Sequence, residues 1–528
     1  MPPPGVLRLG GALRRSGWDV RLVDLAHELA AGHLGAERVL DEDSLGAAAE
    51  RIHADEPDTG GRPTLGATLP AALVITRMLR ERAPRLHLHL GGPGIGEVDE
   101  RVLERFDWIA LIVRGEGEVT LHEVLERLKD GQSPGGVQGI TWRDSRGRIV
   151  READRRPLLD MNEVAPYAWD LLPDLTRYKE LTGEAEGLVP VDSGRGCSYD
   201  CSFCSIGRYW GRRSRTLPVD RLVQEVLAIQ SMPAAKNAYL CHDLFGADRQ
   251  HALAFCARLS ELGAPVPWEC RARSDHMDGD LLQAMGDAGC YRVLLGVESA
   301  APEVRAQNAK NMAADTDILE LVENCARAGI TPILSFILGL PGEGDEELAA
   351  SLDLCADASL RTGVNLSLHL ANPQPSCELG KEYNPDAVAL KDIPPDMAWG
   401  AGDSEPEQEF IRAHPDLFST WHLLPLPEQR LRDLSRIAQE LPEILQRYPR
   451  TFCLLRRMRG EDAFGLWRAW DATGLSFEGL ARMARDPLVD ETLAWEQALV
   501  KRVPTVLHTE HDLAQLTAAL AGGTALPA

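Results

Sequence analysis

The sequence contains no run of the roughly 18–20 uninterrupted apolar residues that a membrane-spanning helix requires. Its first residues, MPPPGVLRLGG, lack the basic start and apolar core of a signal peptide. Positive charge is also scarce, since 56 Lys and Arg stand against 80 Asp and Glu and give a net charge of −24. These absences argue against a membrane protein and against a nucleic-acid partner bound through its phosphates. They predict a cytoplasmic protein whose substrate is a small molecule or a peptide.

A disulfide framework is also not expected. The chain has 11 cysteines, an odd number, in a long sequence without an export signal, which favours reduced thiols. Eight of them are scattered, often among apolar neighbours, as is typical of small core residues. These are Cys241, Cys256, Cys270, Cys290, Cys325, Cys355, Cys377 and Cys453. The other three lie close together and are considered below.

Residues 1–136 alternate helical and strand patterns, which predicts a Rossmann-like domain with a parallel sheet covered by helices. The expected helices are 5–17, 69–84 and 119–131, and the expected strands are 18–26, 86–94 and 108–113. No strand is predicted before the first helix, which is unusual for such a sheet. Ligands bind these sheets at the carboxyl ends of the strands, where the turns GGPG and RGEGE fall.

A linker with a hairpin is expected at 137–185, and a second, more regular alternation at 186–378. Its six strands and intervening helices predict a partial (β/α)6 barrel with its active site at the carboxyl ends of the strands. The strands are expected at 187–193, 237–243, 266–273, 291–298, 330–339 and 364–370, and the helices at 219–230, 248–262, 279–288, 303–328 (broken) and 344–359.

Residues 379–528 are predicted to form a C-terminal, mainly helical domain related to the substrate. Residues 384–410 read as a loop, and amphipathic helices are expected at 426–448, 462–474, 476–486 and 511–523. Tryptophans in this region could line a substrate pocket, although core packing is the usual role of such residues. They are Trp399, Trp421, Trp467, Trp470 and Trp495.

Cys197, Cys201 and Cys204 stand in the stretch GRGCSYDCSFCSIG, directly after the first strand of the predicted barrel. A structural zinc site needs four ligands, usually as two pairs, and no second pair stands at a suitable distance. A four-iron cluster also has four ligand positions, so three thiolates would leave one iron open to bind something else. The alternatives are three unrelated cysteines or a small redox or metal-sensing loop.

The spacing CxxxCxxC, with Phe203 before the last cysteine, resembles the motif of the radical S-adenosylmethionine (SAM) family. The resemblance implies that Cys197, Cys201 and Cys204 hold a [4Fe-4S] cluster whose open iron binds SAM. In this family an electron from the cluster cleaves SAM to a 5′-deoxyadenosyl radical, and an electron donor such as flavodoxin or ferredoxin is implied as a partner.

Further segments resemble the later strand ends of the same family, in the same order. They are YLCHDLF, WECRARSD, AGCYRVLLGVES, FILGLPGEGDEEL and LANPQPSCEL. The resemblance implies that Phe203, Arg273, Glu298 and Gly339 contribute to the SAM pocket, although a carboxylate such as Glu298 is as often a capping or ion-paired residue. The sequence departs from the family pattern at His242, Gly344 and the pair Ser376–Cys377.

The first domain resembles that of the cobalamin-binding subclass of this family. The matching residues are Gly91, Gly92, Pro93, Gly115, Glu116, Gly117 and Glu118. Glycines would allow the backbone to approach a large planar cofactor, but they could equally serve only tight strand-to-helix turns. No DxHxxG motif stands in residues 1–130, so cobalamin would be held without a histidine lower ligand.

The resemblance implies a cobalamin-dependent radical SAM methyltransferase that methylates a carbon centre of a small-molecule or peptide natural-product intermediate with SAM, methylcobalamin and a [4Fe-4S] cluster. One alternative keeps these cofactors but catalyses cyclisation, ring contraction or oxidation. Another is polar methylation of a ring carbon, and a fourth is an iron–sulfur electron carrier or sensor. His242 and His369 end two predicted strands and are candidate catalytic bases, with hydrogen-bonded packing as the alternative role.

Overall fold

A computed structural model describes residues 2–35, 41–64, 68–172, 175–176, 187–313, 316–361, 363–381, 404–422, 424–447 and 460–471, together with 449, 452–453 and 456–457. By packing, the chain divides into two compact units. Unit 1 comprises Met1–Val293 and Ala371–Leu426, and unit 2 comprises Leu294–Leu370 and Pro427–Ala528. Each unit is described by itself.

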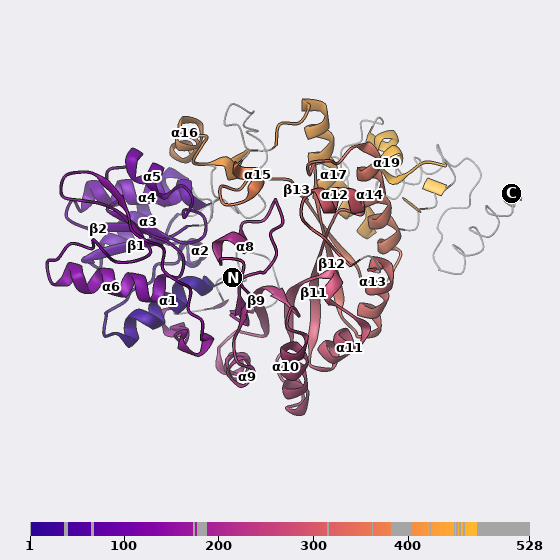
Figure 1. Cartoon of the computed structure of the whole chain (residues 1–528), viewed down its shortest axis with the longest axis horizontal. Helices are drawn as coiled ribbons and strands as arrows, with labels where there is room; N and C mark the ends of the chain where they lie inside the picture. The colour runs from indigo at the N-terminus through magenta and orange to yellow at the C-terminus, as the bar shows by residue number, and fades with distance from the viewer. Residues whose placement is uncertain are drawn as a thin grey trace, which may run out of the picture. The chain divides into compact units, whose positions relative to one another are not determined.

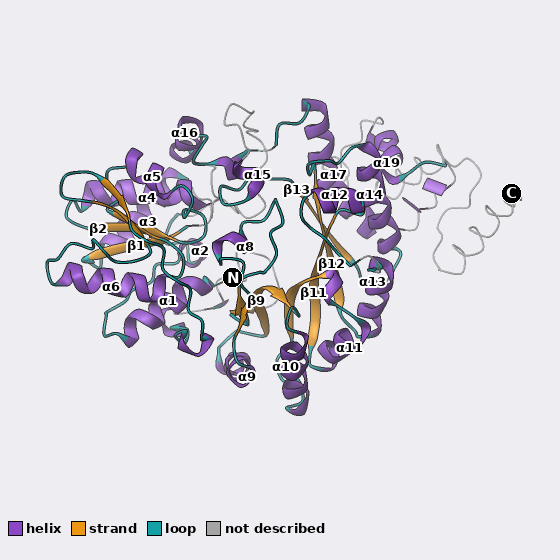
Figure 2. Cartoon of the chain, viewed as in Figure 1, coloured by secondary structure: helices purple, strands orange, loops and turns teal. Residues whose placement is uncertain are grey.

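The N-terminal part of unit 1 contains a five-stranded mixed sheet in the order β1-β2-β3-β4-β5 (Figures 1 and 2). The first three strands are parallel and the last two form an antiparallel hairpin on the edge. They are β1 (Thr59–Pro63), β2 (His87–Gly91), β3 (Leu111–Val113), β4 (Ile140–Arg143) and β5 (Ile149–Arg151). The predicted hairpin is therefore confirmed, and it extends the sheet.

Helices cover both faces of this sheet because consecutive residues of a strand point to opposite sides. Leu111 and Val113 pack in one core with α1 and α6, whereas Ile112 packs in the opposite core with α3, α4 and α5. The helices are α1 (Pro4–Arg15), α2 (Leu25–Ala30), α3 (Glu42–His53), α4 (Leu69–Arg82), α5 (Asp99–Arg105) and α6 (Gly117–Lys129). This arrangement confirms the predicted Rossmann-like architecture.

The strand expected at 18–26 is wrong. Residues 18–24 have no regular secondary structure, and α2 begins at Leu25. Trp18, Val20 and Leu22 are partly buried, whereas Asp19 and Arg21 between them are exposed. The alternating pattern therefore predicts correctly which side chains face the protein interior. A strand also needs a hydrogen-bonded neighbour, which an alternating pattern cannot supply.

The second sheet has six strands in the order β13-β12-β11-β10-β9-β6, and its strands follow one another in chain order. The pairs β6–β9, β9–β10 and β12–β13 are parallel. The strands are β6 (Leu188–Val191), β9 (Asn237–Phe245), β10 (Trp268–Arg273), β11 (Cys290–Glu298), β12 (Thr331–Leu338) and β13 (Asn365–Leu370). All six lie where the sequence predicts them.

The helices between these strands also match the predictions. They are α9 (Val219–Ala228), α10 (Arg249–Glu261), α11 (Gly279–Asp287), α12 (Pro302–Gln307), α13 (Ile318–Arg327) and α14 (Asp345–Ser359). Asp248, Asp278 and Asp317 cap the first turns of α10, α11 and α13 through their carboxylates. The helix expected at 303–328 is broken, as predicted, into α12 and α13.

The chain beyond β13 contributes helices first to unit 1 and then to unit 2. The described helices are α15 (Glu378–Lys381), α16 (Glu405–Ala413), α17 (Glu428–Arg447) and α19 (Ala463–Asp471). In unit 1, α16 packs on α4, and the Phe410 ring lies edge-on to Phe106 with centroids 5.5 Å apart. In unit 2, α17 packs on β13 and α19 packs on α14.

The helices predicted at 426–448 and 462–474 are confirmed, whereas the loop predicted at 384–410 is wrong for Glu405–Phe410, which belong to α16. The helices predicted at 476–486 and 511–523, Trp399, Trp495 and the Trp470 side chain lie outside the described residues. Trp421 and Trp467 are buried, as core packing predicts.

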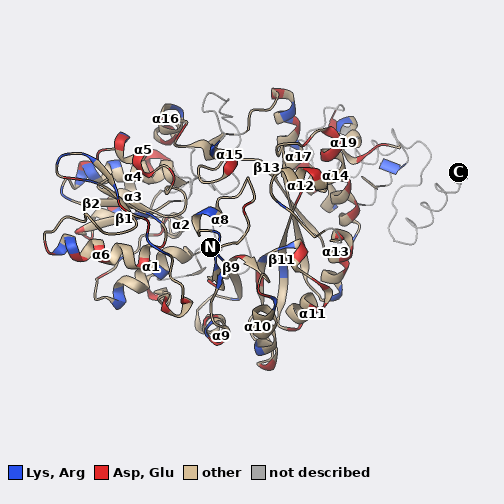
Figure 3. Ribbon diagram, in the orientation of Figure 1, with Lys and Arg blue, Asp and Glu red and all other residues tan. Residues whose placement is uncertain are grey.

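Acidic and basic positions are interspersed along the coloured helices in Figure 3. Among the described residues, no helix combines the length and apolar character needed to cross a membrane.

Candidate functional site

The three clustered cysteines lie on a loop that follows the carboxyl end of β6, the first strand of the second sheet. After β6 the chain forms β7 (Gly194–Arg195), passes through Cys197, Cys201 and Cys204 and the short helix α8 (Ile206–Tyr209), and returns in β8 (Arg215–Thr216). β7 and β8 pair antiparallel, so they close residues 196–214 into one loop, the cysteine loop. Its three cysteine residues are partly exposed, whereas seven of the other eight cysteines are buried.

Two glycines allow this loop to fold tightly. Gly196 has φ +91°, and a Cβ there would lie 2.1 Å from the Arg213 carbonyl oxygen. A Cβ on Gly207 would lie 2.1 Å from the Tyr199 carbonyl oxygen. Real Cβ atoms do not approach oxygen so closely, so both positions require glycine.

The chemistry of the three thiols fits an iron–sulfur cluster better than a single ion. Among the residues that the structure describes, no group of His, Cys, Asp or Glu converges on one metal ion. Cluster thiolates bind separate iron atoms, so they need not meet at one point. Burial and the nearby Cys201 and Cys197 raise the pKa of Cys204 to about 12, and a bound metal would reverse this by taking the thiolate as ligand.

In unit 1, Arg273 lies beside the cysteine loop at the end of β10. Its guanidinium stacks 3.8 Å from the centroid of the Tyr199 ring and makes two hydrogen bonds to Asp275, of 2.9 and 3.0 Å. Tyr199 in turn makes a 2.7 Å hydrogen bond with His276 Nε2. Phe203 is half-buried on the same loop. The SAM contacts predicted for Phe203 and Arg273 stay predictions.

In unit 2, Glu298 ends β11 with a strained backbone, at φ +68°. Its carboxylate pairs with Lys310 at 3.0 Å, and both side chains are buried. A Cβ on Gly296 would lie 2.4 Å from the Glu298 carboxylate, so Gly296 leaves the space for this pair. Strain of this kind concentrates at binding sites, and here it is combined with a buried charge pair at a strand end.

Gly339, also in unit 2, ends β12 with φ +79°, and its N–H donates a 2.6 Å hydrogen bond to Glu343. The other Glu343 oxygen is buried without a hydrogen-bond partner in the described residues. Burial raises the pKa of Glu343 to about 7, although Arg430 lies 3.9 Å away. The SAM roles predicted for Glu298 and Gly339 also stay predictions.

The two candidate bases have hydrogen-bonded partners. His242 Nε2 lies 3.1 Å from Ser214 Oγ, and burial lowers the His242 pKa to about 4. A Cβ on Gly194 would lie 2.9 Å from this imidazole, so the ring packs against the strand that leads into the cysteine loop. His369 Nε2 lies 2.7 Å from Ser367 Oγ. The packing role is thus well supported for His242, and neither proposed catalytic role has been tested.

The glycine turns of the first domain lie at the carboxyl ends of β2 and β3, as expected. Gly92 has φ +107°, and a Cβ there would lie 2.5 Å from the Thr64 carbonyl oxygen. Gly115 has φ +67° and open space around its Cβ position. Gly91, Gly92, Pro93, Gly115, Glu116, Gly117 and Glu118 remain predicted cobalamin contacts. Two of them, Glu116 and Glu118, pair with arginine at 2.8 and 2.7 Å.

The loop after β13 lies against the cysteine loop within unit 1. Leu379 N–H donates to the Ser202 carbonyl at 3.1 Å, and Ser205 Oγ lies 2.8 Å from Gln374. Arg208 forms an ion pair with Glu378. Cys377, where the sequence departs from the family pattern, is buried and donates to the Gln374 carbonyl.

Several residues of the site were not assigned from the sequence. In unit 1, Tyr199 and Asp275 contact the predicted site residue Arg273. In unit 2, Lys310 pairs with Glu298, and Glu343 accepts from Gly339. Arg195 is another, and it precedes the cysteine motif by only two positions. Charged residues beside a ligand motif are a usable signal, but the partner of each charge is set by the tertiary fold.

Residues 191–355 match the family model described as the Radical SAM superfamily. This segment of the chain is therefore a radical SAM region, and the relatives and structural neighbours of the chain include cobalamin-dependent enzymes.

Among the relatives is an uncharacterised methyltransferase of Pyrococcus horikoshii, which is 26% identical over 355 residues, covering 66% of this chain and 72% of that protein. The anaerobic magnesium-protoporphyrin IX monomethyl ester cyclase of Rubrivivax gelatinosus is 25% identical over 362 residues, covering 67% of this chain. The match spans 62% of the cyclase, less than two thirds of its length.

Among solved structures, the fold is similar to that of the radical SAM methyltransferase TsrM from Kitasatospora setae, in a structure with cobalamin and a [4Fe-4S] cluster bound. The TM-score is 0.60, the sequence identity is 17%, and the alignment covers 85% of this chain and 97% of TsrM. This likeness confirms the predicted architecture of a Rossmann-like sheet, a six-stranded radical SAM sheet and C-terminal helices.

Proposed function

We propose that the chain is a cobalamin-dependent radical SAM methyltransferase that methylates a carbon centre of a small-molecule or peptide intermediate of natural-product biosynthesis. The observation that carries this proposal is the cysteine loop, with three partly exposed cysteine residues, in one chain with a Rossmann-like sheet whose strands β2 and β3 are followed by glycine turns. The similarity to TsrM over 85% of the chain supports it.

The cofactors in such an enzyme supply a carbon-centred radical from SAM at the cluster and a methyl group carried by cobalamin. The protein's own residues bind and orient. Cys197, Cys201 and Cys204 would hold the cluster as thiolates, and the open iron would be left to SAM. In unit 2, the buried Glu298–Lys310 pair lies at the end of β11, and ligands of this fold bind at strand ends, so Glu298 remains a proposed SAM contact.

In the first domain, the turn at Gly92 and the open turn at Gly115 offer backbone without side chains to a large planar cofactor. Small-molecule or peptide substrates fit the acidic chain better than nucleic acid does. A reduced flavodoxin or ferredoxin would supply the electron.

The similarity to the Rubrivivax gelatinosus cyclase favours a second candidate, which uses the same cofactors for cyclisation or oxidation. Polar methylation of a ring carbon is a third. The three differ in what becomes of SAM, so product analysis distinguishes them.

The test uses the full chain, reconstituted anaerobically with iron, sulfide and hydroxocobalamin, and incubated with SAM and dithionite. Formation of both 5′-deoxyadenosine and S-adenosylhomocysteine supports the proposal. Formation of 5′-deoxyadenosine alone favours the cyclase-like alternative, and S-adenosylhomocysteine alone favours polar methylation. If neither forms, the proposal is wrong and an electron carrier or sensor is favoured.

A further inference from the structure

Two arginines stand directly opposite each other at the base of the cysteine loop. Arg195 of β7 pairs in register with Arg215 of β8, and both side chains are buried. Facing residues of an antiparallel pair project to the same side of the ribbon, and two like charges in this position repel each other. A buried pair of guanidinium groups here therefore needs carboxylates between or beside them.

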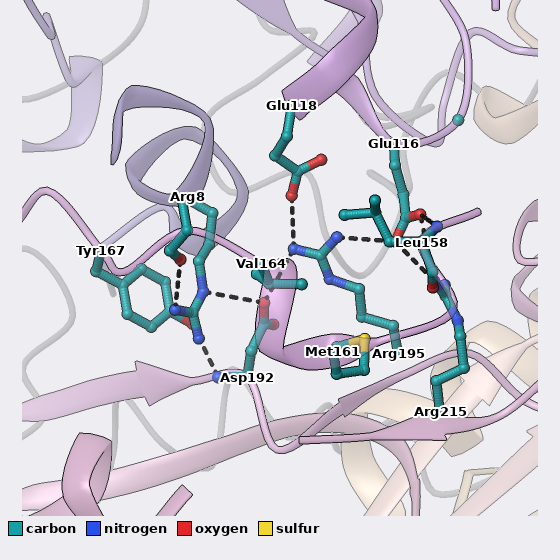
Figure 4. Close-up of polar contacts among 12 residues, drawn as sticks. Arg8, Glu116, Glu118, Leu158, Met161, Val164, Tyr167, Asp192, Arg195 and Arg215 are labelled. Carbon is teal, nitrogen blue, oxygen red and sulfur yellow. Dashed lines mark hydrogen bonds and ion pairs between the residues drawn. The ribbon is translucent and has the colours of Figure 1, made fainter. Parts of the chain in front are cut away.

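The carboxylates come from the glycine turn of the first domain. Glu116 accepts from Arg195 at 2.8 Å and from Arg215 at 3.0 Å, and Glu118 accepts from Arg195 at 2.7 Å (Figure 4). The Tyr209 hydroxyl, on α8 at the far end of the cysteine loop, donates to the Gly115 carbonyl at 2.9 Å. Residues 114–118, which we call the glycine turn, thus contact both strands at the base of the cysteine loop and the helix α8 within it.

These contacts are charge-assisted hydrogen bonds between buried side chains. Three carboxylates surround the Arg195 guanidinium, with Glu116 at 2.8 Å, Glu118 at 2.7 Å and Asp192 at 3.3 Å. The Arg195 side chain is 7% exposed, and those of Glu116 and Glu118 are 7% and 11% exposed. Charge-assisted hydrogen bonds shielded from water are shorter and more directional than exposed ones.

The network continues to the first helix and the strand end of β6. Asp192 lies 3.3 Å from both Arg195 and Arg8. Arg8, on α1, stacks 3.6 Å from the centroid of the Tyr167 ring (Figure 4). It also donates to Glu225 at 2.9 and 2.5 Å.

The segment that links the two sheets is held by the same network. The Leu158 N–H donates to Glu116 at 2.6 Å, and Arg215 donates to the Leu158 carbonyl. The Ala165 carbonyl accepts from Arg8 at 2.9 Å. A displacement of the glycine turn would therefore break several buried contacts at once, unless the cysteine loop moved with it.

We propose that Arg195 is a positioning residue that couples the glycine turn of the first domain to the loop that carries the cluster. Cobalamin bound at the glycine turn then orders the cysteine loop through Arg195, without touching it. This inference rests on the proposed function, because the glycine turn is the proposed cobalamin site. Lysine is a poor substitute, because a single ammonium lacks the planar fork that reaches Glu116, Glu118 and Asp192 together.

The test compares the reconstituted full chain with its Arg195→Lys variant by hydrogen–deuterium exchange and by the EPR spectrum of the reduced cluster, with and without hydroxocobalamin. In the unsubstituted protein, hydroxocobalamin should slow exchange in both the glycine turn and residues 196–214, the latter by about tenfold. In Arg195→Lys the glycine turn should still be protected, whereas the cysteine loop and the cluster signal should no longer respond.

Two further variants keep the test decisive. The double variant Arg195→Lys/Glu118→Gln removes the carboxylate that lysine leaves unpaired, so it should fold well and remain uncoupled. Arg249→Lys is the matched control, because Arg249 also makes two hydrogen bonds to one carboxylate, Asp278, but is exposed. It should respond to hydroxocobalamin like the unsubstituted protein.

The coupling is overturned if the cysteine loop responds equally in Arg195→Lys and in the unsubstituted protein, or if it does not respond when the glycine turn is protected. If hydroxocobalamin does not bind at all, the proposed function is refuted, and exchange without cofactor decides the coupling. Arg195→Lys should then exchange faster than Arg249→Lys in both segments, and an increase in only one segment would overturn the inference.

Discussion

At the scale of single residues, three glycines, which have no side chain, allow the cysteine loop to lie where it does. Gly194, Gly196 and Gly207 each face an atom less than 3 Å from where a Cβ would stand. Gly194 leaves space for the His242 ring, and the other two let the loop fold back on its own carbonyls. The motif spacing of the cysteines is readable in the sequence, whereas the atoms that these glycines approach are not.

Replacing Gly207 with alanine should therefore damage the cysteine loop. The new methyl group would meet the Tyr199 carbonyl oxygen at 2.1 Å, and we expect a loss of about 2 kcal/mol or more in the free energy of unfolding. Iron content after reconstitution should fall with it. Thermal unfolding and iron analysis measure both effects.

Gly46→Ala is the control for this substitution. Gly46 lies inside α3 with nothing within 4 Å of its Cβ position, so alanine should stabilise the helix by roughly 0.5–1 kcal/mol. Normal iron content and stability in Gly207→Ala would show that the loop is not packed as described.

Glu343 should make stability depend on pH. Its pKa is raised from 4.5 to about 7 by burial, so the folded state holds a proton that the unfolded state releases. This contribution to stability is present below pH 4.5 and is lost as the pH rises through 7. The groups that face Glu343 are the Gly339 N–H, Arg430 and Glu347.

Glu343→Gln removes this titration while keeping an acceptor for the Gly339 N–H. Between pH 5.5 and pH 8 the unsubstituted protein should lose about 2 kcal/mol in the free energy of unfolding that the variant does not lose. Denaturant unfolding at the two pH values measures this. An equal difference between the two proteins at both pH values would contradict the raised pKa.

At the scale of elements, the second sheet was predicted completely and the first only in part. Strands such as β12 are long and buried, with helices of clear period between them, so pattern alone defines them. β1 has the sequence TGGRP, in which glycine and proline conceal the strand. It forms because Gly61 leaves space for the His89 ring of the neighbouring β2.

The helix α16 was missed because its proline, acidic residues and sequence neighbours resemble a loop. Ser404 and Glu407 cap its start reciprocally, a signal that the sequence does contain. Its packing on α4, more than 300 residues earlier in the chain, cannot be read from local pattern.

Phe410→Ala should therefore destabilise the N-terminal sheet with α16, and not α17 and α19. Phe410 is 7% exposed and packs against Phe106, so its removal should cost about 3–5 kcal/mol. Hydrogen exchange should rise in α4 and β2. Leu262→Ala, at a position 43% exposed, should change little, and equal effects of the two substitutions would contradict this packing.

At the scale of the whole molecule, the fold class was predictable because it depends on short-range pattern. The cysteine motif is readable in the same way, and its role as cluster ligand stays a prediction. The contacts around the cysteine loop were not predictable. Arg195 and Glu116 are 79 positions apart, and the sequence gives no period or motif that joins them. The same holds for Asn372, whose side chain donates to the Thr420 carbonyl. Long-range polar pairing is fixed by tertiary packing, and only the structure shows it.

The central claim is that Cys197, Cys201 and Cys204 hold a cluster that cleaves SAM. The most direct measurement is the visible absorption and the yield of 5′-deoxyadenosine of the reconstituted chain, compared with Cys201→Ala and with Cys453→Ala, in which a buried thiol bonded to the Ala356 carbonyl is removed. We predict that Cys201→Ala loses both the brown cluster absorption and all SAM cleavage, while Cys453→Ala retains them. Persistence of either signal in Cys201→Ala would contradict the account.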